Sequence, residues 1–291
     1  MQRKKKNGMV WLEFDLLQLF PEVKHGIFLN PPLGDLDDAT NPFRALDALD
    51  IKKGVKLRQC HKADLIEVKN TTPECYPCRF EGIFDFSSDL RGQNDHILGS
   101  SRGHFVPLRM EEKKNSSEFA WVTLRGATPL LTHFENYDGM VTQEKEVALL
   151  VRHADCQGTL FYDPIRHALA AVHCGWRGSV QNIYQKTIEK MKGLYGTDPA
   201  DLIVCIGPSL GPEHAEFKNY KEELPKHFWD FQVRPTYFDF WEISRWQLEE
   251  EGIPEEQIEI AEICTYANDK DFFSYRRNQS TPHHGTLAAL T

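Results

Sequence analysis

The chain has 291 residues, of which 41% are hydrophobic and 26% charged. At ~100–200 residues per domain, this length fits one large domain or two small ones, and the composition excludes disordered, collagen-like and coiled-coil proteins. Lysine and arginine number 34 against 43 aspartates and glutamates, and the net charge of −9 argues against a nucleic-acid partner because an acidic surface repels a phosphate backbone.

The N-terminal basic run of residues 3–6 resembles the start of a signal peptide, but Glu13 and Asp15 interrupt the apolar segment after it. No apolar stretch approaches the ~20 residues that a transmembrane helix needs. We therefore expect a cytoplasmic protein without membrane association. The seven cysteines are an odd number, which argues against a closed set of disulfides and favours buried, metal-binding or nucleophilic cysteines.

Strand signals alternate with turns in the first part of the chain. Residues 25–29 are predicted to form a strand that ends at two prolines, and residues 55–68 carry β-favouring runs at both ends, so that His61 lies at a strand terminus. Residues 70–136 are rich in Asn, Ser, Gly and charge, and we interpret them as an insertion in a single domain spanning residues 1–291.

The second half shows the clearest periodicity. Three strands within thirty residues predict a buried sheet, and a helix with Ser179 as its N-cap and Gly196 as its stop follows them. The predicted strands are 147–151, 158–162, 168–173 and 201–206, and the predicted helices are 180–195 and 241–251. The pattern alone predicts an α/β or α+β fold.

Two strand ends present a thiol and an imidazole, because His173 follows Cys156 by 17 residues. Thiolate and imidazole are good Zn²⁺ ligands, and a catalytic zinc needs three protein groups, for which His61 is the natural third. From spacing alone, the alternative of a buried cysteine and two ordinary histidines is equally open. The pair Cys75 and Cys78 could supply half of a zinc site, but the sequence has no second pair of cysteines to complete it. We interpret the pair as structural or incidental.

Two further segments suit an anionic or aromatic ligand. Arg177 and Ser179 lie at the predicted start of a helix, where free N–H groups favour a phosphate, although a capped helix with a solvated arginine is the commoner case. Tyr275 and Arg276 lie in an aromatic and cationic run over residues 272–277 that could stack on a ring, or equally form a strand with solvated arginines.

Together these segments resemble the YfiH family of laccase-domain proteins, formerly labelled polyphenol oxidases. The resemblance is specific over about residues 138–291 and looser over 25–69. It implies one α/β (α+β mixed) unit in which mixed sheets pack against helices and the site lies where strand ends converge. The matching segments are Gln59-Cys60-His61-Lys62, His153-Ala154-Asp155-Cys156, His173-Cys174-Gly175-Trp176-Arg177-Gly178, 206–212, Cys264-Thr265-Tyr266 and 272–277.

The resemblance implies a metal site and a reaction. In the family the corresponding residues bind zinc, which implies Zn²⁺ at His61, Cys156 and His173, with copper as the alternative. It also implies phosphorolysis of adenosine, inosine, guanosine or methylthioadenosine, and deamination of adenosine. We expect Cys156, Asp155 and His173 to be catalytic, with Asp155 orienting a ligand or moving a proton. The purine nucleoside and phosphate are expected to bind at Arg177, Ser179, Tyr275 and Arg276.

The chain departs from the family pattern at three places. Residues 29–32 replace a glycine-rich segment that carries an arginine, Thr286 stands where the family has another arginine, and His153 stands where it has threonine. We therefore expect a shifted substrate choice. His153 is also a candidate to perturb or replace a metal ligand.

Two other functions stay open. One is a metal-free amide hydrolase with Cys156 as nucleophile and His173 as base, including the editing of cell-wall precursors. The other is a non-catalytic nucleoside-binding protein, which the missing arginines and the insertion suggest. Laccase activity is not expected, because a multicopper oxidase needs clustered His-x-His ligands and the 12 histidines include no such pair.

Overall fold

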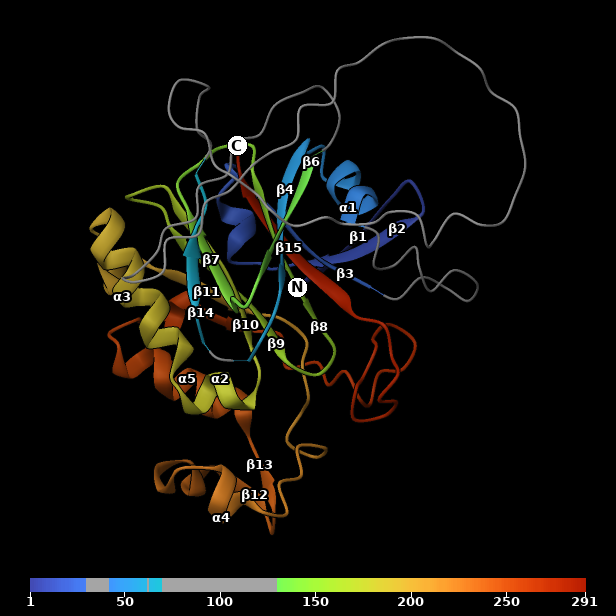
Figure 1. Ribbon diagram of the computed structural model, residues 1–291, viewed down its shortest axis with the longest axis vertical. Coiled ribbons are helices and arrows are strands. Elements are labelled where there is room, and N and C mark those ends of the chain that lie inside the picture. Colours follow the sequence, from blue (N-terminus) through green and yellow to red (C-terminus); the bar gives the residue numbers. More distant parts are fainter. Residues whose placement is uncertain (30–41, 62, 70–129) are drawn as a thin grey trace, which may run out of the picture. The chain divides into compact units, whose positions relative to one another are not determined.

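The computed structural model describes residues 1–29, 42–61, 63–69 and 130–291, all within the unit formed by residues 1–71 and 119–291. Two mixed β-sheets form its centre (Figure 1). The seven-stranded sheet has, in spatial order, β1 (Gln2–Lys6), β2 (Met9–Glu13), β3 (Val23–Phe28), β15 (His284–Leu290), β8 (Ala148–His153), β4 (Lys53–Arg58) and β6 (Leu130–Glu135). The six-stranded sheet has β14 (Ile258–Ile260), β11 (Ile203–Ile206), β9 (Gln157–Asp163), β10 (Ala168–Cys174), β7 (Gly139–Thr142) and β5 (Leu65–Glu67).

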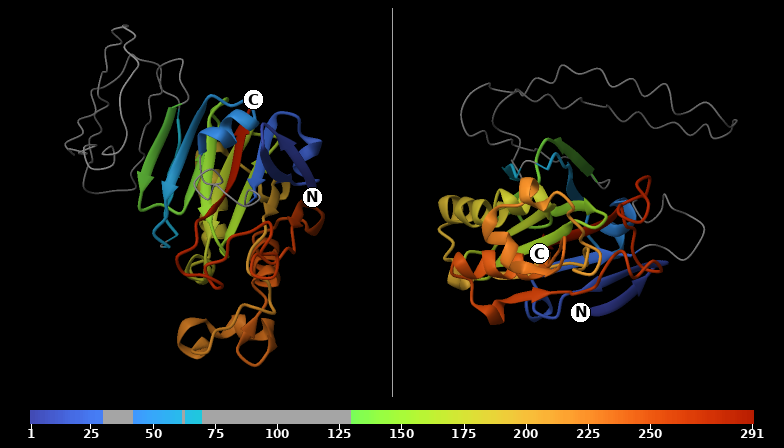
Figure 2. Two further views of the ribbon diagram at one scale, coloured as in Figure 1. Left: turned by 90° about the vertical axis from the view of Figure 1, so that its right-hand side faces the viewer. Right: turned by 90° about the horizontal axis from the view of Figure 1, so that it is seen from below.

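Helices cover the outer face of each sheet, which gives four layers. Helix α1 (Pro42–Ala48) packs on the seven-stranded sheet, where Leu46 joins a cluster with Leu150 of β8 and Leu287 of β15. Helices α3 (Ile183–Tyr195) and α5 (Phe240–Glu250) pack on the six-stranded sheet. The inner faces of the sheets meet where β9 and β10 contact β8 and β15. The right-hand view of Figure 2 shows α3 and α5 on one side of the central strands and β1 to β3 on the other.

This architecture confirms the predicted fold class of mixed sheets packed against helices. Every residue of β9 and β10 is buried, because one face of these strands lies under helices and the other against the second sheet. The predicted strands at 25–29, 147–151, 158–162, 168–173 and 201–206 are all present with boundaries shifted by a few residues. One sheet was expected for the middle three, but β8 belongs to the seven-stranded sheet and β9 and β10 to the six-stranded one.

The predicted helix at 180–195 is divided in two. Helix α2 (Trp176–Val180) ends first, and Asn182 then begins α3 with φ of 47° and a side chain that accepts a hydrogen bond from the Gln185 N–H. The prediction of Ser179 as N-cap is wrong, because this residue lies inside α2 and an asparagine tolerates the left-handed conformation needed at the junction. Gly196 ends α3 as predicted, with φ of 70°.

Two remaining helical and turn regions complete the C-terminal half. The predicted helix at 241–251 is α5, and its N-cap Asp239 accepts hydrogen bonds from the N–H groups of Trp241 and Glu242. Helix α4 (Tyr220–Glu223) and the ribbon of β12 (Gln232–Arg234) and β13 (Tyr237–Phe238) precede it. Residues 272–277 form a loop and turn rather than the strand considered as an alternative, and Ser274 and Arg276 of this segment donate hydrogen bonds to the half-buried carboxylate of Asp155.

Most of the predicted insertion lies outside the described residues, including Cys75 and Cys78. Its last residues form β6, which pairs in parallel with β4 and so belongs to the central sheet. None of the helices in the described ranges is long and apolar enough to cross a lipid bilayer.

Candidate functional site

The site lies where the chain passes from one sheet to the other. It crosses from the seven-stranded to the six-stranded sheet between β4 and β5, between β6 and β7, and between β8 and β9. These crossings carry His61, Asp138 and Cys156, respectively. Residues in the left-handed region occur at each, with φ of 60° at His61, 69° at Asn136 and 82° at Asp155. Such conformations cost ~1–3 kcal/mol each and persist where the surrounding structure fixes them, which is common at functional sites.

The three predicted metal ligands meet at these crossings. One donor atom each from His61, Cys156 and His173 lies within 4.8 Å of the others, and these residues are the one such group of histidine, cysteine or carboxylate side chains found in the described part of the chain. The imidazoles of His61 and His173 are nearly perpendicular, at 87°, with ring centroids 4.8 Å apart. His173 is buried, Cys156 half-buried and His61 exposed, so the cluster opens to solvent on the side of His61.

Asp138 organises this cluster and was not identified from the sequence. Its carboxylate lies 3.3 Å from His173 Nδ1 and accepts hydrogen bonds from the backbone N–H groups of Cys60, His61 and Ala63. One buried side chain therefore orients one predicted ligand and holds the loop that carries another. A signal was present in the sequence, where an aspartate directly precedes the apolar residues 139–141, but its partners are distant in the chain.

The cluster favours a charge-separated thiolate and imidazolium. Burial alone would raise the pKa of Cys156. The imidazoles of His173 and His61 lower it by more than burial raises it, so that the pKa falls from 9.0 to about 6. Burial lowers the pKa of His173, but the Cys156 thiolate and the Asp138 carboxylate raise it to about 9. A thiolate is the form in which cysteine binds metals and acts as a nucleophile.

Gly175 allows the cluster to close. A Cβ at this position would lie 3.1 Å from Cys156 Sγ and 3.2 Å from His61 Cδ2, closer than most real Cβ contacts. A side chain here would therefore displace two predicted ligands.

The cluster lies in a cleft of 1110 Å³ that both sheets and the segment around α4 contribute to. One part of its lining is aromatic, with Trp176, Phe217 and Phe240 in mutual ring contacts at centroid distances of 5.9 and 5.1 Å. Arg177 lies over the Trp176 ring, 4.0 Å from its centroid. The cleft thus combines a metal-type donor cluster with surfaces suited to an aromatic ring and an anion.

All four residues predicted to bind substrate line this cleft. Tyr275 is 55% exposed and Arg276 is also exposed, with its guanidinium donating to the Glu216 carbonyl. Arg177 is exposed as well. Ser179 is buried, and its hydroxyl donates to Gln247 Oε1 at 3.3 Å, so this hydroxyl serves the contact between α2 and α5.

Asp155 fastens the loop that carries Tyr275 and Arg276. Its carboxylate accepts hydrogen bonds from the hydroxyls of Thr265 and Ser274 and from the backbone N–H of Arg276, at 2.7, 3.0 and 2.6 Å. Because three hydrogen bonds occupy its oxygens, this carboxylate holds the backbone of the loop in place.

His153 is directed away from the cluster and into the space between the sheets. Its Nε2 lies 2.7 Å from Thr286 Oγ1, and its ring contacts that of His284 at a centroid distance of 4.3 Å. His153 is fully buried, and burial together with His284 lowers its pKa well below the usual value. The three grouped donors do not include it.

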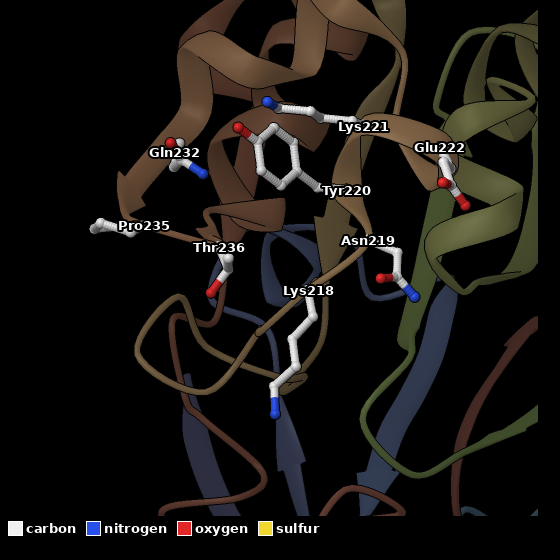
Figure 3. A pocket seen from close by; sticks show the side chains of 8 residues that line it. All are labelled: Lys218, Asn219, Tyr220, Lys221, Glu222, Gln232, Pro235 and Thr236. Carbon is white, nitrogen blue, oxygen red and sulfur yellow. The ribbon is translucent and has the colours of Figure 1, made fainter.

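A second hollow, of 470 Å³, lies over α4 and β12 (Figure 3). Its lining carries the side chains of two lysines, one glutamate and several neutral residues, without a cysteine or histidine. The Lys221 amino group lies over the Tyr220 ring in this hollow, 6.0 Å from its centroid. We therefore place the functional site in the larger cleft.

The donor set fits a zinc ion by its chemistry. One thiolate and two imidazoles are suitable Zn²⁺ ligands, and three protein ligands leave a position for water or substrate, as in catalytic sites. The carboxylate of Asp138 beside His173 is the type of partner that orients metal-binding histidines. The residues present therefore have the donor chemistry to hold a metal ion.

Sequence comparisons identify relatives that are named as enzymes. The chain is 36% identical over 149 residues to a protein of Bacteroides thetaiotaomicron named purine nucleoside phosphorylase, covering 48% of this chain and 55% of the relative. It is 30% identical over 164 residues to the purine nucleoside phosphorylase YlmD of Bacillus subtilis, covering 53% and 59%. The aligned region thus spans little more than half the length of these relatives.

Solved structures share the fold over nearly the whole chain. The YfiH protein of Bacillus licheniformis superposes with a TM-score of 0.69 at 19% identity, covering 99% of both chains. YlmD from Geobacillus stearothermophilus superposes with a TM-score of 0.67 at 19% identity, covering 99% of this chain and 97% of the other. A family model described as multi-copper polyphenol oxidoreductase laccase matches residues 37–291, and the chain therefore belongs to this family of laccase-like proteins, which the sequence motifs indicated.

Proposed function

We propose that the protein is a zinc-dependent enzyme that cleaves purine nucleosides by phosphorolysis, with adenosine, inosine, guanosine or methylthioadenosine as substrates. The observation that carries this proposal is the grouping of His61, Cys156 and His173 donors within 4.8 Å inside a cleft with aromatic and cationic walls. The names of the relatives support the reaction class.

Each part of the cleft has a role in this reaction. The rings of Trp176 and Phe217 would hold the purine base, and Tyr275 and Arg276 would border the nucleoside. His61, Cys156 and His173 would hold the metal, which when bound acts as a Lewis acid on a coordinated oxygen. Asp155 acts as a positioning residue, because its three hydrogen bonds fix the loop that carries Arg276.

Phosphorolysis exchanges one bond at the ribose for another. A phosphate oxygen bonds to the anomeric carbon as the bond to the purine nitrogen breaks, and the base leaves with the electron pair and gains a proton. The products are the free base and ribose 1-phosphate, or 5-methylthioribose 1-phosphate from methylthioadenosine. Attack of water on C6 of adenine, with loss of ammonia, would instead convert adenosine to inosine, and we include this deamination in the proposal.

The test is turnover by the protein and its Cys156→Ala variant. Both are incubated with the four nucleosides, with and without phosphate, and products are identified by chromatography and mass spectrometry. We expect ribose 1-phosphate only when phosphate is present, and no turnover by the variant. Cys205→Ala, which removes a buried cysteine of β11, is the matched control and should stay active. Full activity of Cys156→Ala would overturn the mechanism.

The lowered pKa of Cys156 favours a second candidate, a metal-free cysteine amide hydrolase with His173 as its base. Alkylation separates the two. A thiolate bound to zinc should react with iodoacetamide only after chelation, whereas a free nucleophile should react at once with or without a chelator. A protein that binds nucleosides in titration calorimetry but forms no product would instead be the non-catalytic binding protein.

A further inference from the structure

We propose that Lys56, Arg152 and His283 form a phosphate-binding subsite of the cleft, distinct from the arginines predicted to bind substrate. The inference rests on the proposed function for its place in a reaction, but the subsite itself rests on the positions and charges of these three side chains.

Strand register brings the three residues together. Lys56 of β4 pairs with Leu150 of β8, and Arg152 lies two residues further along β8, on the same face of the sheet because side chains alternate. Arg152 pairs with Gly285 of β15, and His283 precedes that residue by two. Three neighbouring strands thus present two cations and a histidine on one face, and all three side chains line the cleft.

The charges of Lys56 and Arg152 are not neutralised by a carboxylate of the described residues. All three residues are half-buried. Within the described ranges no carboxylate forms an ion pair with Lys56 or Arg152, and the Arg152 Nε is buried without a hydrogen-bond partner. Burial and the Arg152 charge lower the pKa of Lys56 to about 8. Two adjacent, partly desolvated cations are costly unless an anion accompanies them.

A phosphate has the chemistry that this arrangement recognises. An arginine guanidinium binds phosphate oxygens through paired N–H groups, and a lysine adds a point charge. The subsite also borders the candidate metal centre, because the charges of His173 and His61 act on His283. An anion held here would therefore lie beside the predicted reaction centre. Its source is either inorganic phosphate, which phosphorolysis consumes, or the phosphate ester of a nucleoside monophosphate.

The test measures phosphate binding apart from turnover. Inorganic phosphate is titrated into the protein by calorimetry without nucleoside, so that no turnover occurs, and the same is done for Lys56→Met and Arg152→Gln. We expect each substitution to weaken phosphate binding roughly tenfold or more, because each removes a charged donor. Lys53→Met, on the same strand but outside the cleft lining, is the matched control and should bind as the parent does. Two independent variants guard against misfolding of either one, which circular dichroism would reveal.

Adenosine monophosphate distinguishes the two sources. If the subsite holds a phosphate ester, this nucleotide should bind more tightly than adenosine, compete with inorganic phosphate, and lose its advantage in Lys56→Met. If it holds the free co-substrate, inorganic phosphate should bind in a way that depends on Lys56, and the nucleotide should gain no affinity over adenosine. Either result supports the subsite.

Two outcomes separate this inference from the proposed function. Binding of phosphate that depends on Lys56, without any turnover, overturns the function and keeps the subsite. Turnover in which Lys56→Met and Arg152→Gln leave the KM for phosphate unchanged overturns the subsite and keeps the function. Absence of phosphate binding by the parent protein also overturns the subsite.

Discussion

At the scale of single residues, the candidate metal centre depends on the absence of a side chain at Gly175 and on the electrostatic interaction of Cys156 with two histidines. His61, Cys156 and His173 approach one another because Gly175 carries no side chain between them. The same proximity lets two imidazoles stabilise the Cys156 thiolate. Both features can be tested by changes at one position.

Gly175→Ala should weaken metal binding by roughly 10–100-fold, the usual range for changes just outside the ligands. The added Cβ would lie 3.1 Å from Cys156 Sγ and force it aside. Zinc affinity can be measured by competition with a chromophoric chelator. Gly193→Ala is the matched control, because nothing lies within 4 Å of a Cβ at that exposed position in α3. Equal affinity in both variants would contradict the close approach at Gly175.

The Cys156 thiolate of the metal-free protein should persist from alkaline pH down to about pH 6. Because the pKa is lowered by folding, Cys156 contributes stability in full above its ordinary pKa of 9.0, and this contribution is lost as the pH falls through about 6. The ultraviolet thiolate absorbance, taken as the difference from Cys156→Ser, follows the titration. A midpoint near the ordinary thiol value would show that His173 and His61 do not act on this sulfur.

At the scale of elements, the site is made by segments that connect the two sheets. Asp138 begins the passage into β7, and its hydrogen bonds hold the residues that follow β4. Asn182 plays a comparable part on the helical side, because it ends the short helix α2 and begins α3. Each residue links elements whose own sequences do not specify how they join.

Asp138→Asn should weaken metal binding by roughly 10–100-fold and lower the free energy of unfolding by ~1–3 kcal/mol. An amide has one acceptor oxygen in place of two, so some N–H groups of the His61 loop lose their partner, and His173 loses a charged neighbour. Asp163→Asn is the matched control, since Asp163 is equally buried, accepts two backbone N–H bonds on its Oδ1, and lies at the end of β9 opposite to Cys156. This control should keep its zinc affinity.

Asn182→Ala should lower the free energy of unfolding by ~1–2 kcal/mol, because it removes the hydrogen bond to the Gln185 N–H and places a Cβ-bearing residue without a polar side chain at φ of 47°. Asn182→Gly should cost less, since glycine adopts this conformation freely. Urea unfolding of the two variants measures the difference. A larger loss in the glycine variant would contradict the assignment of strain at this junction.

At the scale of the whole molecule, the predicted ligands come from distant segments of the chain. His61 and Cys156 are more than 90 residues apart in the sequence. A metal held there bridges the ends of both sheets and binds the folded chain only. Removing it should therefore lower the melting temperature by roughly 10 °C, if the free metal is ~1000-fold above its Kd. Calorimetry with and without chelator measures the shift, and the His61→Ala variant, with one ligand removed, should show a much smaller one.

The sequence by itself determined several central strands and the end of α3, because these depend on neighbouring residues. Burial on both faces favours the apolar runs 160–162 of β9 and 168–172 of β10, and Gly196 ends α3 through its own backbone freedom. The motif around Cys156 also identified the family before any contact was known.

Only the tertiary structure decided which residues meet. It separated β8 from β9 and β10, placed His153 against Thr286 instead of the metal site, and gave Asp155 and Ser179 structural hydrogen bonds. It also brought Asp138 to His173 and grouped Lys56 with Arg152. The physical reason is that sheet register and crossings between sheets join residues distant in the chain, and local periodicity carries no information on such pairings.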